Sequence, residues 1–430
     1  MTEEWPLPSY PLRPAMPSLW TLLRHGIADV ASVIPASILE LPAVQLPGPG
    51  APLVVADPVL IREVLNDRDG RFVRDKFMTR MNRRAWGKGL AAADGEAWQR
   101  QRRAAAPAFR PQAVDANGAA FAAAAAKAAQ SWPQGEPIEL TQRAARIIAD
   151  IVFTVLVDGQ GSVDADAVAA DIPAYVRRIT NFGTSDLLPI PEAWHDRLRG
   201  VDADPAVQRI RALAHQLASQ RQSYQKRGDL IDLMLGKGPI EDNIRGLFPA
   251  AMETTMGAVS WTLYVLALRP EWQSRVAEEA RQCGGEWQLE NLPVTRRVVQ
   301  EVLRLYPPAP LLVRSAVAAG ELGGHRLRRS QVVSLHIYAM HRHRTLWDEP
   351  DAFDPDRFLP ERGQHPGWLP FGFGPRVCIA AQFALAEIAV VVARLLAELE
   401  LSATGPEPVV SLQVTTKSLN GLHVIARPRS

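Results

Sequence analysis

The sequence has only two cysteines, Cys283 and Cys378, among 430 residues, and they lie far apart in the chain. This scarcity excludes a disulfide framework and the cysteine clusters that bind zinc, and it predicts a reducing compartment, the cytoplasm. A surplus of one charge is also missing, because 48 lysines and arginines face 46 aspartates and glutamates. With the opposite charges nearly cancelled, no overall field attracts nucleic acid or an anionic membrane, and neither is expected as a partner.

The sequence also lacks a secretory leader and a clear membrane-spanning run. Residues 1–17 are acidic and proline-rich, with no cationic segment followed by an apolar one. The stretches 247–268 and 379–399 are apolar enough to test, but Glu253 interrupts the first and Glu387 the second. Because a charged group inside a bilayer is costly, both stretches are predicted to be buried helices of a large soluble protein.

The length allows two ordinary domains or one large domain. Residues 1–50 are predicted to be a proline-rich lead-in packed on the domain, with a short amphipathic helix around 18–30. Residues 51–430 are predicted to form one mainly helical domain, because helical patterns follow one another with only short proline- and glycine-containing breaks. The expected fold class is mainly α with a small β region.

Three stretches near the ends of this domain have distinct patterns. A strand at 51–56 and a helix at 58–66 are predicted to open it. The basic and irregular stretch 72–93 is predicted to be one long loop, and long loops in compact domains are often functional. Alternating runs between 399 and 428 predict strands near the C-terminus.

The most informative stretch is 371–380, with the sequence Phe-Gly-Phe-Gly-Pro-Arg-Val-Cys-Ile-Ala. Gly372 and Gly374 permit backbone angles that other residues avoid, so this loop can fold tightly against a flat partner. Cys378 lies where an apolar helix begins, and free N–H groups and the helix dipole there favour a thiolate. A thiolate in a rigid apolar loop meets the requirement for an axial ligand of haem iron.

The pattern Phe371-x-x-Gly374-x-Arg376-x-Cys378 resembles the haem-binding loop of the cytochrome P-450 superfamily, the haem-thiolate monooxygenases. The family usually has glycine two residues after the cysteine, where this chain has Ala380. The resemblance implies that Cys378 is the axial ligand of haem b and that this loop supports the porphyrin. An inert buried thiol remains the alternative for the cysteine alone.

A second landmark lies inside the helix predicted at 240–268, in the sequence Ala-Ala-Met-Glu-Thr-Thr from Ala250. Pro249 removes a backbone donor and predicts a local break, where a threonine hydroxyl or water bonds the freed carbonyl. The motif resembles the family's central helix, with Ala251 in place of the usual glycine. The resemblance implies that Glu253 and Thr254 deliver protons during oxygen activation. A buried capping cluster without chemistry is the alternative.

Trp98 and Arg102 lie four residues apart, so they share one face of a predicted helix. An indole N–H beside a guanidinium forms a good anion clamp, because both groups donate and arginine stays charged. In the family a Trp-x-x-x-Arg pair binds a haem propionate, and the resemblance implies that role here. It assigns a second propionate to Arg314. An aromatic anchor beside a solvated arginine remains the alternative.

Glu301 and Arg304 are spaced so that their side chains meet on a helix. The family joins such a pair to a later arginine as a structural triad below the haem, and Arg357 matches that position. The strand-like residues after Arg304 and the central helix are predicted to line an apolar substrate pocket. Its expected members are Phe248, Ala250, Leu311, Leu312, Val313 and Thr415.

The resemblance covers about 51–428 and implies one large domain with haem between the helix of Glu253 and the loop of Cys378. The implied activity is oxygen- and reductant-dependent hydroxylation or epoxidation of a hydrophobic small molecule such as a fatty acid, terpenoid, steroid or aromatic. No flavin or iron–sulfur domain is expected. NAD(P)H electrons are therefore expected from a separate ferredoxin or flavodoxin and its reductase, docking near Arg103 and Arg110.

Three other functions remain open from the sequence. A haem-thiolate peroxygenase or isomerase needs no redox partner, and a haem sensor needs Cys378 but no proton relay. A cysteine hydrolase needs no haem, but it requires a histidine base, and no histidine lies in a supporting motif.

Overall fold

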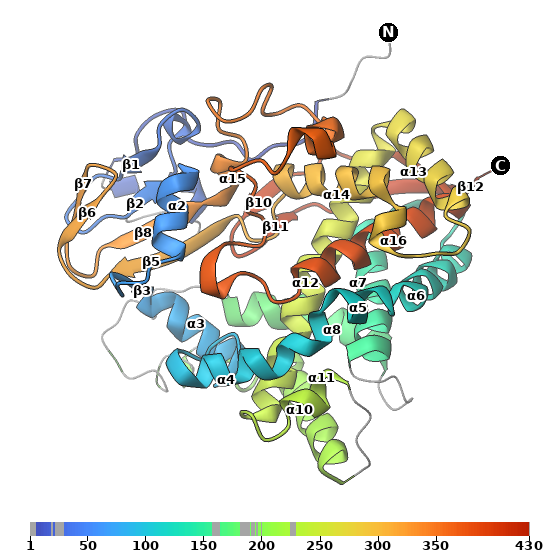
Figure 1. Ribbon diagram of the computed structural model, residues 1–430, viewed down its shortest axis with the longest axis horizontal. Coiled ribbons are helices and arrows are strands. Elements are labelled where there is room, and N and C mark those ends of the chain that lie inside the picture. The colour runs from blue at the N-terminus through green and yellow to red at the C-terminus, as the bar shows by residue number, and fades with distance from the viewer. Residues whose placement is uncertain are drawn as a thin grey trace.

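The computed structural model describes residues 6–18, 20–21, 30–156, 164–180, 190, 194, 197–198, 200–223 and 229–429. The helix predicted around 18–30 lies almost entirely outside these residues. Helices make up most of the molecule, and a small β-rich region lies at one end (Figure 1). The predicted fold class, mainly α with a small β region in a single domain, is confirmed.

The helices follow the chain in a nearly continuous series. They are α2 (Pro58–Leu65), α3 (Lys76–Trp86), α4 (Gly95–Ala105), α5 (Pro111–Asp115), α6 (Gly118–Ser131), α7 (Leu140–Ile151), α8 (Ala165–Thr180), α10 (Pro205–Ser223), α11 (Leu230–Met234), α12 (Ile240–Ala267), α13 (Pro270–Gln282), α14 (Pro293–Leu305), α15 (Ile337–Met340) and α16 (Ala381–Glu398). The described part of the chain contains no helix that is long and apolar enough to cross a membrane.

The main sheet has the strand order β1-β2-β8-β5-β3, formed by Ala43–Gln45, Leu53–Val55, Val332–His336, Leu311–Ala316 and Phe72–Arg74. Only β2 and β8 pair in parallel, and the other neighbours are antiparallel. Because β1 pairs with β2, the lead-in before residue 51 contributes a strand to the same sheet.

The other strands form three smaller units. Strand β12 (His423–Pro428) lies between β4 (Pro137–Glu139) and β9 (Leu399–Ala403). Two hairpins complete the set, β6 (Gly320–Leu322) with β7 (His325–Leu327), and β10 (Val410–Leu412) with β11 (Thr416–Ser418). The strands predicted near the C-terminus are therefore confirmed.

Helix α12 runs through the middle of the molecule (Figure 1) and packs against α7, α10, α14 and α16. Its C-terminal half is almost wholly buried, and Trp261 stacks on Tyr306 with ring centroids 4.0 Å apart. Burial of this kind is the main stabilising contribution in a domain of this size. The helices at 240–267 and 381–398 confirm the buried helices predicted from the apolar stretches.

The predicted long loop at 72–93 is wrong. Residues Phe72–Arg74 form β3, and Lys76–Trp86 form the helix α3. Basic residues dominate the sequence of this helix, so its narrow apolar face was not recognised. On that face Met81 and Ala85 lie one turn apart, and both are buried. Pairing of β3 with β5 is a long-range contact that no local pattern shows.

The predicted break at Pro249 is also wrong, because α12 continues without interruption from Ile240 to Ala267. Proline removes one backbone donor, but packing against the surrounding helices holds the helix together. The threonine hydroxyl nearby does not bond the carbonyl that Pro249 leaves without its donor, that of Arg245. Instead, Thr254 Oγ1 donates to the carbonyl of Ala250 at 2.9 Å.

Candidate functional site

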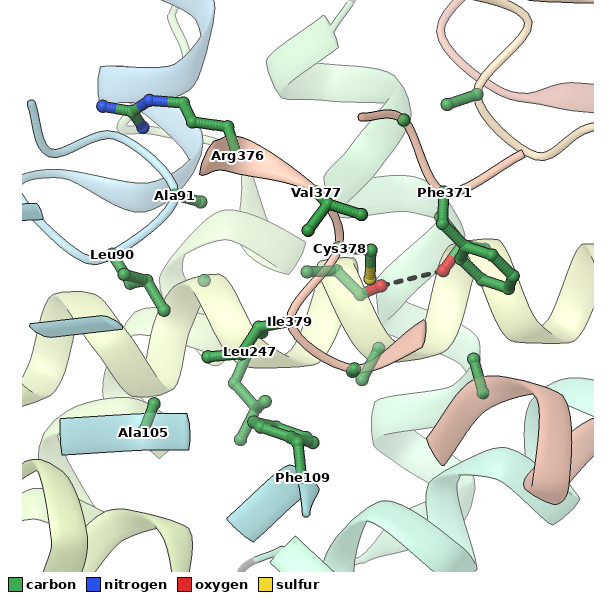
Figure 2. Close-up of a pocket in the computed structure, with 18 of the residues that line it drawn as sticks. Leu90, Ala91, Ala105, Phe109, Leu247, Phe371, Arg376, Val377, Cys378 and Ile379 are labelled. Carbon is green, nitrogen blue, oxygen red and sulfur yellow. Dashed lines mark hydrogen bonds between the residues drawn. The ribbon is translucent and has the colours of Figure 1, made fainter. Parts of the chain in front are cut away.

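A cavity of about 540 Å³ lies between α12 and the loop at 371–380. This volume is within the usual range for a small-molecule site. The walls are mostly apolar and come from α3, α4, α11, α12, β5 and α16. Figure 2 draws Phe371, Cys378 and Ile379 of the loop around this cavity, together with Leu247 of α12 and Phe109.

Two glycines give the loop its shape. Gly372 has φ +74° and Gly374 has φ +72°, a region that L residues with a side chain rarely adopt. A Cβ on Gly374 would also lie 2.5 Å from the carbonyl oxygen of Leu65, so a side chain is excluded there. The loop closes through a 3.0 Å hydrogen bond from the backbone N–H of Cys378 to the carbonyl of Phe371. These contacts fix the direction of the Cys378 side chain.

Cys378 is accessible, but the surface it exposes belongs to the cavity wall and not to the outside of the molecule. Burial raises the pKa of its thiol, while the Ala380 N–H and the Arg102 charge lower that pKa. Burial is the largest of these effects, so the chain's own groups together raise the thiol pKa. A coordinated metal ion reverses this balance, because it deprotonates a thiol ligand outright.

Ala380 lies at the start of α16 with φ −99° and ψ 20°, a conformation open to any residue. It lines the cavity, as does Ala251 of α12. The replacement of the family's usual glycine by Ala380 therefore introduces no backbone strain. The methyl group of Ala380 forms a small part of the cavity wall.

Four arginines, Arg74, Arg102, Arg314 and Arg376, line the same cavity. Burial lowers the pKa of Arg102 and of Arg314, and it lowers the pKa of Arg376 to about 10. Asp94 pairs with Arg74 and with Arg376, each at 2.6 Å. Among the described residues, Asp94 is the carboxylate that forms ion pairs with this cluster, so the four guanidinium groups outnumber it on this side of the cavity.

Trp98 lies within this arginine cluster. The guanidinium carbon of Arg102 is 5.6 Å from the centre of its ring and that of Arg376 is 4.5 Å away, distances typical of cation–π contacts. Arg102 also donates to the carbonyl of Val377 at 2.8 Å, which ties α4 to the cysteine loop. The structure thus brings Trp98, Arg102 and Arg376 together beside Cys378.

Arg314 completes the cluster from strand β5. It donates to the carbonyl of Val313 at 2.9 Å and, within the described part of the chain, forms no ion pair with a carboxylate. The cavity thus offers a single thiol, mostly apolar walls and guanidinium groups that bind anions. This donor set fits haem, which has an iron atom, an apolar ring and two carboxylates.

The two residues of the predicted acid–alcohol pair point in different directions. Thr254 lines the cavity, together with its hydrogen-bond acceptor Ala250. Glu253 is not part of the cavity wall, and its Oε1 accepts a 3.1 Å hydrogen bond from Thr415 Oγ1 of the β10–β11 turn. Burial raises the pKa of Glu253, whereas the Thr415 bond and the Lys417 charge lower it.

Glu301, Arg304 and Arg357 meet in the structure. Arg304 binds both oxygens of the Glu301 carboxylate at 2.7 Å, and both side chains are 0 % exposed. Arg304 also donates to three backbone carbonyls, those of His341, Pro350 and Ala352. Arg357 lies 3.4 Å from Glu301, and the N–H of Asp354 donates to the same carboxylate at 2.9 Å.

Only part of the predicted substrate pocket lies at the cavity. Ala250 and Leu312 line it, but Leu311, Val313, Phe248 and Thr415 do not. Side chains alternate between the two faces of a strand, so Leu312 and Arg314 share the cavity face of β5 while Leu311 and Val313 point the other way. Phe248 is fully buried against Phe153, with ring centroids 5.4 Å apart.

The sequence patterns missed Glu387 as a cavity residue. It lies on α16, is only 2 % exposed and lines the cavity, and it has no hydrogen-bond partner among the described residues. Burial raises its pKa well above the usual range for glutamate. In the sequence its only signal was a charged residue inside a long apolar helix.

A pH-dependent stability difference follows from Glu387. Because its carboxyl has a raised pKa in the folded protein, it favours folding below the unfolded-state pKa, near 4.3, and loses this contribution as pH rises. Glu387→Gln removes the titration. We expect the free energy of unfolding of this variant to rise relative to the wild type as the pH increases above about 4.3, with a slope of at most about 1.4 kcal/mol per pH unit. Urea unfolding at several pH values measures it, and parallel curves would contradict it.

The comparisons with known proteins agree with one another. A family model described as Cytochrome P450 matches residues 46–423. The chain is 26% identical over 429 residues to "Protein LUTEIN DEFICIENT 5, chloroplastic" of Arabidopsis thaliana, covering 89% of this chain and 71% of that protein. It is 27% identical over 380 residues to cytochrome P450 4A12B of Mus musculus (79% and 74%), and 28% identical over 383 residues to cytochrome P450 4A11 of Homo sapiens (79% and 73%).

Proposed function

Because the chain belongs to the cytochrome P450 family and is therefore a haem-thiolate monooxygenase, we propose that it hydroxylates or epoxidises a hydrophobic small molecule. The observation that carries this proposal is the cavity that places Cys378 and Thr254 on the walls of one apolar chamber. Fatty acids, terpenoids, steroids and aromatics all have the apolar surface that such a chamber excludes from water.

We assign the haem to the donor set around Cys378. The thiolate of this residue would hold the iron, and Trp98, Arg102, Arg314 and Arg376 would bind the propionates. Phe371, Gly374 and Ala380 would shape the loop that faces the porphyrin. Haem bound by a thiolate supplies reductive activation of dioxygen, with the ligand donating electron density that favours O–O cleavage.

The chain's own residues would position the substrate, exclude water from the cavity and supply protons. Leu247, Ala250 and Leu312 would hold the apolar substrate and exclude water from the cavity. The Thr254 hydroxyl, placed on the wall by α12, would hold a proton at the reaction site, and the neighbouring Glu253 would replace it.

The test of this function uses oxygen labelling. The purified, haem-loaded protein is supplied with NADPH, a ferredoxin and its reductase, ¹⁸O₂ and a panel of the four substrate classes. A product that carries one ¹⁸O atom supports the proposal. Product formation with hydrogen peroxide and none with the electron donor would favour a peroxygenase instead.

Electrons are proposed to come from NAD(P)H through a separate ferredoxin or flavodoxin and its reductase. We place the docking surface near Arg103 and Arg110, which are exposed at the two ends of the segment that leads from α4 to α5. A cytoplasmic location is proposed as well, because Cys283 and Cys378 are both free thiols.

Charge reversal tests the docking surface. The double variant Arg103→Glu/Arg110→Glu is expected to lose roughly tenfold or more in donor-driven turnover, because like charges at an interface slow the encounter of acidic partners. Its haem content should match that of the wild type. Arg329→Glu, an equally exposed change in the turn before β8, serves as the control. Equal turnover in all three proteins would contradict the assignment.

A further inference from the structure

Glu253 and Thr254 are adjacent on α12 but face different surroundings. Thr254 lines the cavity, whereas the Glu253 carboxyl reaches the turn of the β10–β11 hairpin. One carboxyl oxygen, Oε1, accepts the hydrogen bond from Thr415. The other, Oε2, is buried and has no partner among the described residues. The carboxyl is thus anchored to the hairpin through one oxygen only.

The hairpin turn that carries Thr415 is held firmly on the core. Leu412 pairs with Thr416 in the hairpin register, which leaves a turn at 413–415. Thr416 donates twice to the segment after α14, from its N–H to Pro308 at 3.2 Å and from its hydroxyl to Pro307 at 2.6 Å. A Cβ on Gly257 of α12 would lie 3.8 Å from the Thr416 carbonyl. The hydroxyl of Thr415 is therefore presented to Glu253 in a fixed position.

The charge around Glu253 comes from the same hairpin. Within the described part of the chain, Lys417 of β11 is the charged group that acts on the Glu253 carboxyl, and its positive charge favours the ionised form. Burial acts in the opposite sense. Lys417 itself is partly accessible.

We propose that the β10–β11 hairpin is part of the proton-delivery machinery, in which Thr415 is a positioning residue for the Glu253 carboxyl. This inference rests on the proposed monooxygenase function. With Oε1 held by Thr415, Glu253 carries its proton on Oε2. It then passes a proton towards the Thr254 hydroxyl, which gives its own proton to the cavity and is restored. Each transfer moves one proton, and no electrons are exchanged with the hairpin.

Three variants separate this role from a structural one. Thr415→Val keeps the shape of the side chain and removes its hydrogen bond to Glu253. Lys417→Gln removes the positive charge of that side chain. Gln413→Ala changes an exposed residue of the same turn and serves as the matched control. All are studied as the haem-loaded protein, with haem content and melting temperature measured first.

The direct readout is the infrared titration of the buried carboxyl, identified by its loss in Glu253→Gln. Because the Thr415 bond and the Lys417 charge both favour the carboxylate, each removal is expected to move the titration midpoint to higher pH. The kcat of Thr415→Val should fall by about three- to tenfold with KM unchanged, and the alkaline limb of its pH profile should move in parallel. Gln413→Ala should match the wild type.

The outcomes are distinguishable. An unchanged titration and pH profile in Thr415→Val, in a wild type that turns over substrate, would overturn the role of the hairpin and leave the monooxygenase function intact. Absence of turnover in the wild type with every donor and substrate would overturn the proposed function and this role together.

Discussion

Cys378→Ala is expected to fold normally and to lose donor-driven monooxygenation to below detection. The side chain lies on the cavity wall, whereas the hydrogen bond that closes the loop comes from the Cys378 backbone N–H, so removal of the thiol leaves that bond in place. The variant lacks the single soft ligand at the site, and no other group of histidine, cysteine or carboxylate side chains in the described chain is arranged to hold a metal ion. Product formation and circular dichroism measure the two parts of this prediction.

Cys283→Ala is the matched control. Cys283 is half-buried at the end of α13, where its thiol donates to the Ala280 carbonyl, away from the cavity. This variant should retain wild-type turnover and wild-type haem content. A Cys378→Ala protein with undiminished turnover would contradict the assignment of the axial ligand.

Arg304→Met is expected to be the most destabilising of these substitutions, by about 3–5 kcal/mol in the free energy of unfolding. The variant leaves the Glu301 carboxylate buried with only Arg357 at 3.4 Å and the Asp354 N–H as partners. It also leaves three backbone carbonyls without their donor. Chemical denaturation of the haem-loaded protein measures the loss.

The double variant Glu301→Leu/Arg304→Met separates charge burial from packing. With both charges removed, we expect a smaller loss than in Arg304→Met alone, because no uncompensated carboxylate remains. Arg281→Met, which breaks an exposed pair with Glu278, should change stability by at most about 1 kcal/mol and serves as the control. A similarly small loss in Arg304→Met would contradict the view that Glu301 and Arg304 are a buried and mutually dependent pair.

Local patterns in the sequence predicted the elements that have strong local signals. The apolar helices at 240–267 and 381–398, and the glycines that bend the cysteine loop, follow from periodicity and backbone freedom. The spacing of Glu301 and Arg304 likewise predicted their contact. The helix at 76–86 was not predicted, because its buried face, with Met81 and Ala85, is narrow and surrounded by basic residues.

The direction of side chains was harder to predict, because it depends on contacts between distant segments. Leu311 and Leu312 look equivalent in the sequence, yet only Leu312 lies on the cavity face of β5. Glu253 reaches a hairpin more than 150 residues later, and no local pattern contains that contact. The burial that raises the pKa of the Cys378 thiol likewise depends on distant segments, whereas the helix start that favours the thiolate is visible in the sequence.

The central claim is that Cys378 binds haem iron as a thiolate, and one absorption spectrum tests it most directly. The purified, haem-loaded protein is reduced with dithionite and exposed to carbon monoxide. We predict the long-wavelength Soret band that is characteristic of thiolate-ligated haem, and its loss in Cys378→Ala. A wild-type spectrum with the Soret band only at the shorter wavelength, or with no haem band at all in folded protein, would contradict the claim.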